Sequence, residues 1–165
     1  MMTYLETIQS KIFQLQSLQK QLCLWRFRSK KIVFTNGCFD VLHYGHINYL
    51  SKAADLGNIL IVGVNSDASV KKLNKGSSRP LQDEKSRATI LASLGFVNAV
   101  IIFEEDTPYE LITHVQPDFL VKGGDWNPAE IVGYDIVKAK GGKVISIEFV
   151  DGFSTTNIEK KILGN

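Results

Sequence analysis

The sequence predicts an α/β fold built on a doubly wound, parallel sheet of five strands. From residue 31 onward, short apolar segments rich in Val, Ile and Phe alternate with longer segments of helical spacing. This alternation is typical of a parallel sheet covered by helices on both faces. Segments rich in glycine, histidine, basic or hydroxyl residues each follow one of the apolar segments. Because ligands of such sheets bind beyond the carboxyl ends of the strands, we expect the functional residues at that edge.

The size and composition of the chain indicate a single folded domain. Its 165 residues suffice for one hydrophobic core. A net charge of +2 is too small to indicate binding to nucleic acid or to a membrane. Two cysteines, Cys23 and Cys38, are too few for a disulfide framework or a zinc cluster. The sequence shows no apolar run long enough to span a bilayer and no secretory signal, so we expect a cytoplasmic protein.

The first thirty residues are expected to form an extension, with the main domain at residues 31–165. Apolar residues recur at three- and four-residue steps between Leu5 and Leu22, which predicts one amphipathic helix over residues 2–26. Residues 1–31 carry six Lys or Arg and one acid, Glu6. Such a helix can bind a membrane surface or serve as a mitochondrial address. Its glutamines favour instead a helix that packs on the main domain or pairs two copies as a homodimer.

The elements of the main domain follow from hydrophobic period and capping residues. Ser66 and Thr107-Pro108 can begin helices, and Gly141-Gly142 can end one. The loop at residues 74–83 is expected to be a mobile lid. The expected strands are 31–35, 58–64, 98–103, 118–122 and 143–149, and the expected helices are 46–56, 66–74, 84–94, 107–115, 130–140 and 155–163.

The most informative segment is residues 38–46, which joins the first expected strand to the first helix. It places His43 and His46 three positions apart, with Gly45 between them. A helix start offers unpaired N–H groups and the positive end of a dipole to an anion. Residues at i and i+3 share one side of a helix, and glycine allows close approach to the backbone. Because imidazole can donate hydrogen bonds, this segment predicts a phosphate site.

Basic residues gather after the second expected strand. Such residues can clamp a triphosphate, but a cluster of this kind can equally be a solvated helix face. One residue of helix register decides whether Lys71 or Lys72 faces the site. The cluster comprises Lys71, Lys72, Lys75, Arg79, Lys85 and Arg87.

Two later segments carry further candidates. The segment at residues 122–125, Lys-Gly-Gly-Asp, directly follows a strand, and its glycines permit close approach of a ligand to the backbone. Asp125 is either an acceptor for a ribose hydroxyl or base amine, or a turn-capping residue. Residues 154–156, Ser-Thr-Thr, open the last helix, where they are either simple caps or phosphate ligands.

Residues 36–46 resemble the HxGH signature of the nucleotidyltransferase superfamily, and the preceding Gly37-Cys38-Phe39-Asp40 strengthens the match. That superfamily has a Rossmann-like fold and transfers a nucleotidyl group from a nucleoside triphosphate to a phosphorylated acceptor. The wider pattern resembles one branch, the D-glycero-β-D-manno-heptose 1-phosphate adenylyltransferases. The similarity covers residues 31–163 and includes segments 34–46, 63–70, 79–80, 106–108, 117–118, 120–125 and 154–156.

The resemblance implies that ATP and the heptose phosphate give ADP-heptose and pyrophosphate, with Mg2+, for the lipopolysaccharide core. It matches the adenylyltransferase half of a bifunctional enzyme, so we expect a separate sugar kinase. One alternative is a cytidylyltransferase for glycerol 3-phosphate or a similar small phosphate. Those relatives usually carry an arginine before the last helix, where this chain has Asp151-Gly152-Phe153. Another alternative is a non-catalytic nucleotide-binding protein on the same fold.

The resemblance also implies roles for individual residues. His43, His46 and Lys72 are expected to be catalytic by stabilising charge, because an acceptor phosphate is already anionic and needs no general base. Asp40, Asn65 and Asp67 are expected to bind the acceptor, and no side chain is assigned to the metal ion. The expected nucleotide-binding residues are Thr35, Asn36, Gly37, Cys38, Phe39, Gly45, Arg87, Lys122, Gly124, Asp125, Ser154, Thr155 and Thr156.

Overall fold

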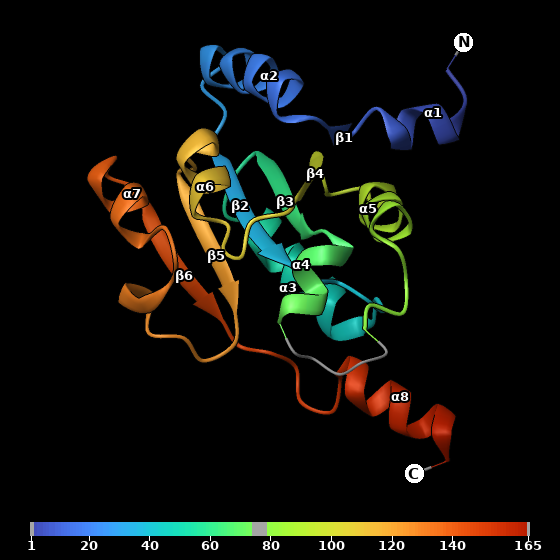
Figure 1. The fold of residues 1–165 in the computed structure, drawn as a ribbon. Coiled ribbons are helices and arrows are strands. Elements are labelled where there is room, and N and C mark those ends of the chain that lie inside the picture. Colours follow the sequence, from blue (N-terminus) through green and yellow to red (C-terminus); the bar gives the residue numbers. More distant parts are fainter. Residues whose placement is uncertain (1, 74–78, 165) are drawn as a thin grey trace.

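The computed structural model describes residues 2–73 and 79–164. Within these residues, a sheet of six parallel strands runs in the order β1-β4-β3-β2-β5-β6 (Figure 1). The doubly wound, Rossmann-like fold is therefore confirmed, although the described sheet has one strand more than the five expected. The strands are β1 (Ile12–Phe13), β2 (Ile32–Gly37), β3 (Ile59–Asn65), β4 (Ala99–Phe103), β5 (Phe119–Gly123) and β6 (Lys143–Ile147).

Helices cover both faces of the sheet. Because side chains alternate along a strand, Ile32 and Phe34 face one core cluster while Val33 faces the other. Helices α2, α6 and α7 contribute to the first cluster, and α3 and α5 contribute to the second. The helices are α1 (Tyr4–Gln9), α2 (Leu15–Phe27), α3 (Tyr44–Ala54), α4 (Asp67–Lys72), α5 (Glu84–Ser93), α6 (Tyr109–Val115), the 3-10 helix η1 (Pro128–Glu130), α7 (Tyr134–Ala139) and α8 (Thr155–Leu163).

The N-terminal segment differs from the single helix predicted over residues 2–26. It forms α1, the short strand β1 and then α2. The backbone of Val100 in β4 donates to the carbonyl of Lys11 at 2.8 Å, so β4 draws this segment into the sheet. The hydroxyl of Ser17 then accepts from the backbone N–H of Gln14 at 3.2 Å and so starts α2. The division between residues 1–30 and 31–165 stays a prediction.

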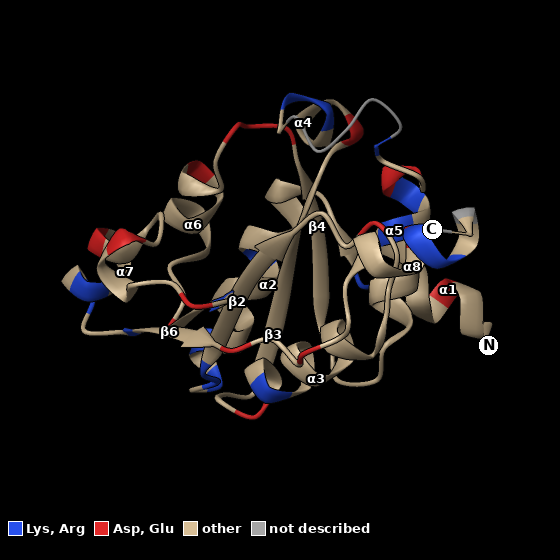
Figure 2. Ribbon diagram, turned by 90° about the horizontal axis from the view of Figure 1, so that it is seen from below, with Lys and Arg blue, Asp and Glu red and all other residues tan. Residues whose placement is uncertain are grey.

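One further expectation is corrected, and another falls partly outside the described residues. The helix expected at residues 130–140 is shorter: η1 ends at Glu130, and α7 begins only after its N-cap Gly133, which has a φ of +88°. Of the loop expected as a lid, residues 74–78 lie outside the described residues. In the part of the chain that is described, no helix is long and apolar enough to cross a membrane. Figure 2 shows basic segments on α4 and α8, and acidic ones interspersed around the fold.

The sheet opens at its centre. β2 lies between β3 and β5, so the direction of winding reverses there. In the described sheet, β2 and β5 pair through Val33 with Phe119 and Phe34 with Leu120, and no further. Beyond these pairs, β2 continues beside β3 and β5 continues beside β6. The carboxyl ends of β2 and β5 therefore separate, and this crevice is where such folds bind ligands.

Candidate nucleotide-binding site

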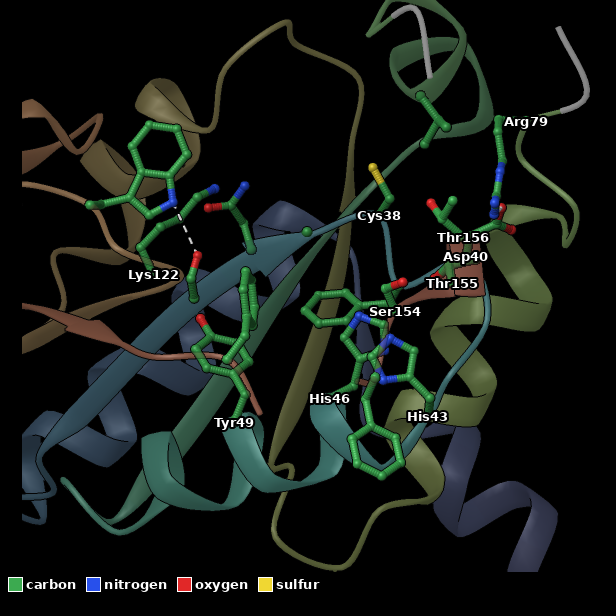
Figure 3. Close-up of a pocket in the computed structure, with 18 residues that line it drawn as sticks. Cys38, Asp40, His43, His46, Tyr49, Arg79, Lys122, Ser154, Thr155 and Thr156 are labelled. Atoms are coloured by element: carbon green, nitrogen blue, oxygen red, sulfur yellow. Dashed lines mark hydrogen bonds and ion pairs between the residues drawn. The ribbon is translucent and has the colours of Figure 1, made fainter. Parts of the chain in front are cut away.

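A pocket of about 720 Å3 opens at the crevice between the ends of β2 and β5. Its walls come from the loop after β2, the start of α3, the turn after β5 and the segment that leads into α8. Figure 3 shows Lys122 and Tyr49 toward one end of this pocket and Arg79 with Thr155 and Thr156 toward the other. The glycine, histidine and hydroxyl segments that are far apart in the sequence thus line one cavity.

The two histidines form a stacked pair at the start of α3. Their ring centroids lie 3.9 Å apart with an interplanar angle of 27°. His43 is the N-cap residue of α3, and its carbonyl accepts from the backbone N–H of His46 at 2.9 Å. Phe39, whose φ of 50° is uncommon for a side chain of its size, supports the His46 ring edge-on at 5.4 Å. The α3 start therefore presents both imidazoles to the pocket.

Both imidazoles are held neutral at pH 7. Burial lowers the pKa of His43. Burial lowers the pKa of His46 to about 4, helped by the adjacent His43 and opposed by a hydrogen bond to the Val41 backbone. Among the described residues, neither buried Nδ1 atom has a hydrogen-bond partner. A buried polar atom without a partner is costly, so the pair is suited to a ligand that supplies hydrogen-bonding groups.

Gly45 is required by its neighbours as well as by any ligand. A Cβ atom at this position would lie 3.0 Å from His43 Nδ1 and 3.2 Å from the Cβ of Phe153. Glycine therefore allows the His43 ring to lie against the first turn of α3. It also allows the segment before α8 to approach that turn. The structure thus adds a packing reason to the close ligand approach predicted from the sequence.

Asp40 anchors the residues that follow the undescribed part of the 74–83 loop. Its buried carboxylate accepts from Arg79 Nη1 at 2.8 Å and from the backbone N–H groups of Leu81 and Gln82 at 2.8 and 2.9 Å. Burial opposes these hydrogen bonds, but together with Arg79 they hold the pKa of Asp40 below its usual value. Arg79 also donates to Glu159 of α8 at 2.5 Å. Asp40 lines the pocket, and its role in binding the acceptor substrate stays a prediction.

Arg87 lies beneath the pocket and is absent from its wall. Its side chain is fully buried and donates to the carbonyls of Gln82 and Cys38, at 3.0 and 2.6 Å, and to Asp67 Oδ1 at 2.7 Å. In this conformation Arg87 ties the loop after β2 to α4 and to the start of α5. It does not present its guanidinium to a ligand, so its predicted nucleotide contact would need a rearrangement.

Lys72, Asn65 and Asp67 also lie away from the pocket wall. Lys72 is exposed and its Nζ is paired with Asp106 at 2.9 Å, which raises the pKa of the lysine. Asn65 is buried, and its amide donates to Ser69 Oγ at 2.9 Å. The carboxylate of Asp67 forms an ion pair with Arg87. In this conformation these three side chains do not meet in the pocket. The catalytic role of Lys72 and the binding of the acceptor substrate by Asn65 and Asp67 stay predictions.

Residues at the end of β2 divide between the wall and the core. Asn36, Gly37, Cys38 and Phe39 line the pocket, and their nucleotide contacts stay predictions. Thr35 is fully buried, and its hydroxyl is hydrogen-bonded to that of Tyr49 in α3. The side chain of Thr35 therefore supports the wall from behind.

The turn after β5 also contributes in part. Lys122 and Gly123 line the pocket. Gly124 has a φ of +112°, which favours glycine, and its backbone N–H donates to Ile147 at 2.9 Å. Asp125 is exposed and does not line the pocket. Trp126 lines it instead, with its indole N–H donating to the Gly123 carbonyl at 3.0 Å.

The start of α8 forms the opposite wall. Ser154 is the N-cap, and its hydroxyl accepts from the backbone N–H of Asn157 at 3.0 Å. Thr155 and Thr156 follow in the first turn, and all three hydroxyl residues line the pocket. The two interpretations of this segment, helix cap and phosphate ligand, are thus compatible. Ser154 caps the helix, and the first turn still faces the pocket.

Several wall residues were not predicted from the sequence. They are Tyr49, Val70, Trp126, Phe149 and Phe153, together with Arg79, which was expected only as one of a basic cluster. The three residues Trp126, Phe149 and Phe153 are half exposed, at 49, 60 and 46 %. For these three, the signal in the sequence is an aromatic residue in the segment that follows a strand.

Within the described part of the chain, the side chains do not form a cage for a metal ion. Across residues 2–73 and 79–164, no three His, Cys, Asp or Glu side chains gather as a metal site. The carboxylate of Asp40, which lines the pocket, is occupied by three N–H donors. Mg2+ commonly binds to phosphate oxygens with few protein ligands.

Comparison with known proteins agrees with this geometry. The model of the cytidylyltransferase-like family matches residues 34–161. The bifunctional protein HldE of Syntrophotalea carbinolica is 54 % identical over 154 residues, which are 93 % of this chain and 31 % of the relative. HldE of Wolinella succinogenes is 52 % identical over 157 residues, which are 95 % of this chain and 32 % of the relative. The chain thus spans about a third of the length of these curated relatives.

Solved structures show the same fold. A lipopolysaccharide core biosynthesis protein from Thermoplasma volcanium is 29 % identical with a TM-score of 0.61, covering 73 % of this chain and 97 % of its own. A pantoate-β-alanine ligase from Francisella tularensis is 18 % identical with a TM-score of 0.55, covering 87 % of this chain and 74 % of its own; at that identity it supports the fold alone. With the family model and the relatives in agreement, the chain belongs to the cytidylyltransferase-like family and is a nucleotidyltransferase domain.

Proposed function

We propose that the chain transfers AMP from ATP to D-glycero-β-D-manno-heptose 1-phosphate, giving ADP-heptose and pyrophosphate. The observation that carries the proposal is the pocket itself, where a stacked histidine pair and the start of α8 face one cavity at the crevice of the sheet. Helix starts and imidazoles are the groups that bind phosphate oxygens. Both proposed substrates, ATP and the heptose phosphate, carry the phosphate groups that such a pocket can bind.

The reaction follows from the chemistry of the two substrates. An oxygen of the sugar phosphate attacks the α-phosphorus of ATP and forms the new P–O bond. The bond from that phosphorus to the oxygen bridging to the β-phosphorus breaks, and pyrophosphate leaves with the electron pair. The sugar phosphate is already anionic at neutral pH, so no residue needs to remove a proton. What the protein supplies is positioning and stabilisation of negative charge.

The histidine pair fits this task. A neutral imidazole donates one N–H, and a polyanion nearby raises the pKa of both rings because it favours their charged form. His43 and His46 would then stabilise the charge on the α-phosphate. Ser154, Thr155 and Thr156 would hold the leaving phosphates at the start of α8. We place the base at the turn after β5, beside Lys122, which also lines the pocket.

Members of this family typically act with a divalent metal ion. We propose Mg2+, entering with ATP as its complex, where it lowers the charge of the triphosphate. The predicted functions of Lys72 and Arg87 would require their present pairs with Asp106 and Asp67 to open.

The heptose phosphate is supported by the relatives named HldE, by the lipopolysaccharide core protein among the solved structures and by the motifs quoted above. We further propose a cytoplasmic protein that acts on ATP and a sugar phosphate and can pair as a homodimer.

Pyrophosphate release tests the proposal directly. The chain is assayed with ATP, CTP, GTP and UTP, each with heptose 1-phosphate and with glycerol 3-phosphate, in the presence of Mg2+. We expect the highest kcat/KM for ATP with the heptose phosphate. A preference for CTP with glycerol 3-phosphate would replace the proposal with the cytidylyltransferase alternative. Nucleotide binding without turnover would instead indicate a non-catalytic protein.

The histidine pair provides a sharper prediction. We expect His46→Ala to lower kcat by about 10²- to 10³-fold, the loss typical of one donor to transition-state charge. His114→Ala, at an exposed position on α6, is the matched control and should retain wild-type turnover. A His46→Ala variant that keeps wild-type kcat would remove this residue from the chemistry.

A further inference from the structure

Tyr49 places a hydroxyl group at the point where β2 and β5 separate. Its side chain comes from α3 and is 4 % exposed. The hydroxyl is hydrogen-bonded to Thr35 Oγ1 of β2 and donates to the Val121 carbonyl of β5 at 3.2 Å. A single side chain thus connects both strands across the opening.

These contacts replace a missing part of the sheet. In the described structure the β2–β5 pairs end at Phe34 and Leu120, one residue before Thr35 and Val121. Backbone groups left unpaired in a buried place are costly, and Val121 is fully buried. The hydroxyl of Thr35 can donate to Tyr49 while Tyr49 donates to Val121, which forms a continuous chain of hydrogen bonds. Tyr49 therefore satisfies the Val121 carbonyl of β5 and ties it to a side-chain hydroxyl of β2.

The strand ends fixed in this way are pocket wall. Asn36 and Gly37 follow Thr35 directly, and Lys122 and Gly123 follow Val121. The ring of Tyr49 also meets Phe149 edge-on at 6.4 Å. A Cβ atom at Gly123 would lie 2.5 Å from the Phe149 ring, so this residue must be glycine for the ring to pack there.

We infer that Tyr49 is a positioning residue for the nucleotide, acting through Thr35 and Val121 to hold the crevice at the width that a base requires. A phenylalanine would fill the same space in the core, so packing alone does not call for the hydroxyl. The inference rests on the proposed function insofar as the nucleotide binds in this pocket. It does not depend on which nucleoside triphosphate is the substrate.

The test is Tyr49→Phe, which removes one oxygen and keeps the ring. We expect the KM for the nucleoside triphosphate to rise by about tenfold, the effect of about one lost hydrogen bond, with kcat within about twofold. We also expect weaker discrimination between ATP and CTP and faster amide hydrogen exchange at residues 121–124. Tyr109→Phe is the matched control. It also removes one tyrosine hydroxyl, which donates a 2.8 Å hydrogen bond to Asp135 at the surface, and it should leave KM unchanged.

A second pair of variants keeps the inference testable if Tyr49→Phe folds poorly. Thr35→Val removes the other hydroxyl and should raise KM in the same way, whereas Thr35→Ser keeps a hydroxyl and should raise KM less than Thr35→Val does. Because both positions act through one chain of hydrogen bonds, the effects of Tyr49→Phe and Thr35→Val should not add. If hydroxyl removal at either position leaves KM and base preference unchanged, whatever the melting temperature does, the inference is wrong.

The assay separates this outcome from failure of the proposed function. The variants are compared on whichever nucleoside triphosphate the wild type turns over fastest. A wild type that prefers CTP would overturn the proposed adenylyl transfer while still testing Tyr49. If the wild type shows no turnover, the same comparison is made on the affinity for MgATP by calorimetry.

Discussion

At the scale of single residues, the site owes its charge state to burial. His43 and His46 stack at 3.9 Å, and two imidazolium ions at that distance would repel each other. Burial lowers both pKa values, so the nucleotide-free pair stays neutral at pH 7. The pair can therefore pack closely without a ligand and respond to one by gaining positive charge.

This arrangement predicts a dependence of stability on pH. The pKa of His46 falls from 6.5 to about 4 on folding, so between these values the unfolded chain binds more protons. The free energy of unfolding should then decrease as pH falls from about 6.5 to about 4. Denaturant titrations at several pH values should show a smaller dependence in His46→Asn than in the wild type. His114→Asn, at an exposed position, should follow the wild type. An equal slope in His46→Asn would contradict the assignment.

At the scale of elements, the N-terminal segment behaves as part of the domain. Strand β1 extends the sheet beside β4, and α2 inserts Leu18 and Leu22 into the same core cluster as Phe34 of β2. A helix that served only a partner or a membrane would not bury these side chains in its own domain. The structure thus supports the packing interpretation of this segment.

Alanine substitutions on α2 test this conclusion. Leu22 is 1 % exposed, so Leu22→Ala should lower the free energy of unfolding by about 2–5 kcal/mol, because it removes buried apolar groups and leaves a cavity. Leu24 lies on the same helix and is 52 % exposed, so Leu24→Ala should change stability by about 0.5 kcal/mol or less. Urea denaturation measures both. Similar values for the two variants would indicate that α2 is not part of the folded core.

The same elements show what the sequence can and cannot predict. The strands β2 to β6 lie within two residues of their expected bounds because each is an apolar segment of a parallel sheet. The break between α1 and α2 could not be predicted, since the apolar spacing continues through it and the cause is the edge of β4. Likewise, an arginine such as Arg87 is a residue type that binds phosphate. Its actual partners, Cys38 and Asp67, come from distant segments, so the sequence alone does not reveal them. Tyr49 lies in a helical apolar pattern, and its hydroxyl contacts depend on the fold.

At the scale of the whole molecule, the pocket is completed by ion pairs between distant segments. Arg79 joins Asp40 after β2 to Glu159 on α8, and these carboxylates are 119 residues apart in the sequence. The rings of Tyr44 and Phe153 meet at 5.1 Å at the same place. The position of the α8 start over the histidines therefore depends on a few contacts.

The Arg79–Glu159 pair can be tested through substrate affinity. Glu159→Gln should loosen α8 and raise the KM for the nucleoside triphosphate by about fivefold, since partly exposed ion pairs contribute about 1 kcal/mol. The neighbouring Lys160→Gln changes the charge of the same helix and should leave KM near the wild-type value. Pyrophosphate release measures both. A fall in KM for Glu159→Gln would mean that Glu159 repels the triphosphate and does not hold the helix.

The short strand β1 has a consequence for the behaviour of the chain in solution. It covers one side of β4, whose five residues are mostly buried and apolar, and it is itself two residues long. A long, bare apolar strand at the border of a sheet recruits strands from other molecules, whereas a very short one offers little to pair with. Removal of residues 1–14 would therefore favour aggregation of the truncated chain through β4.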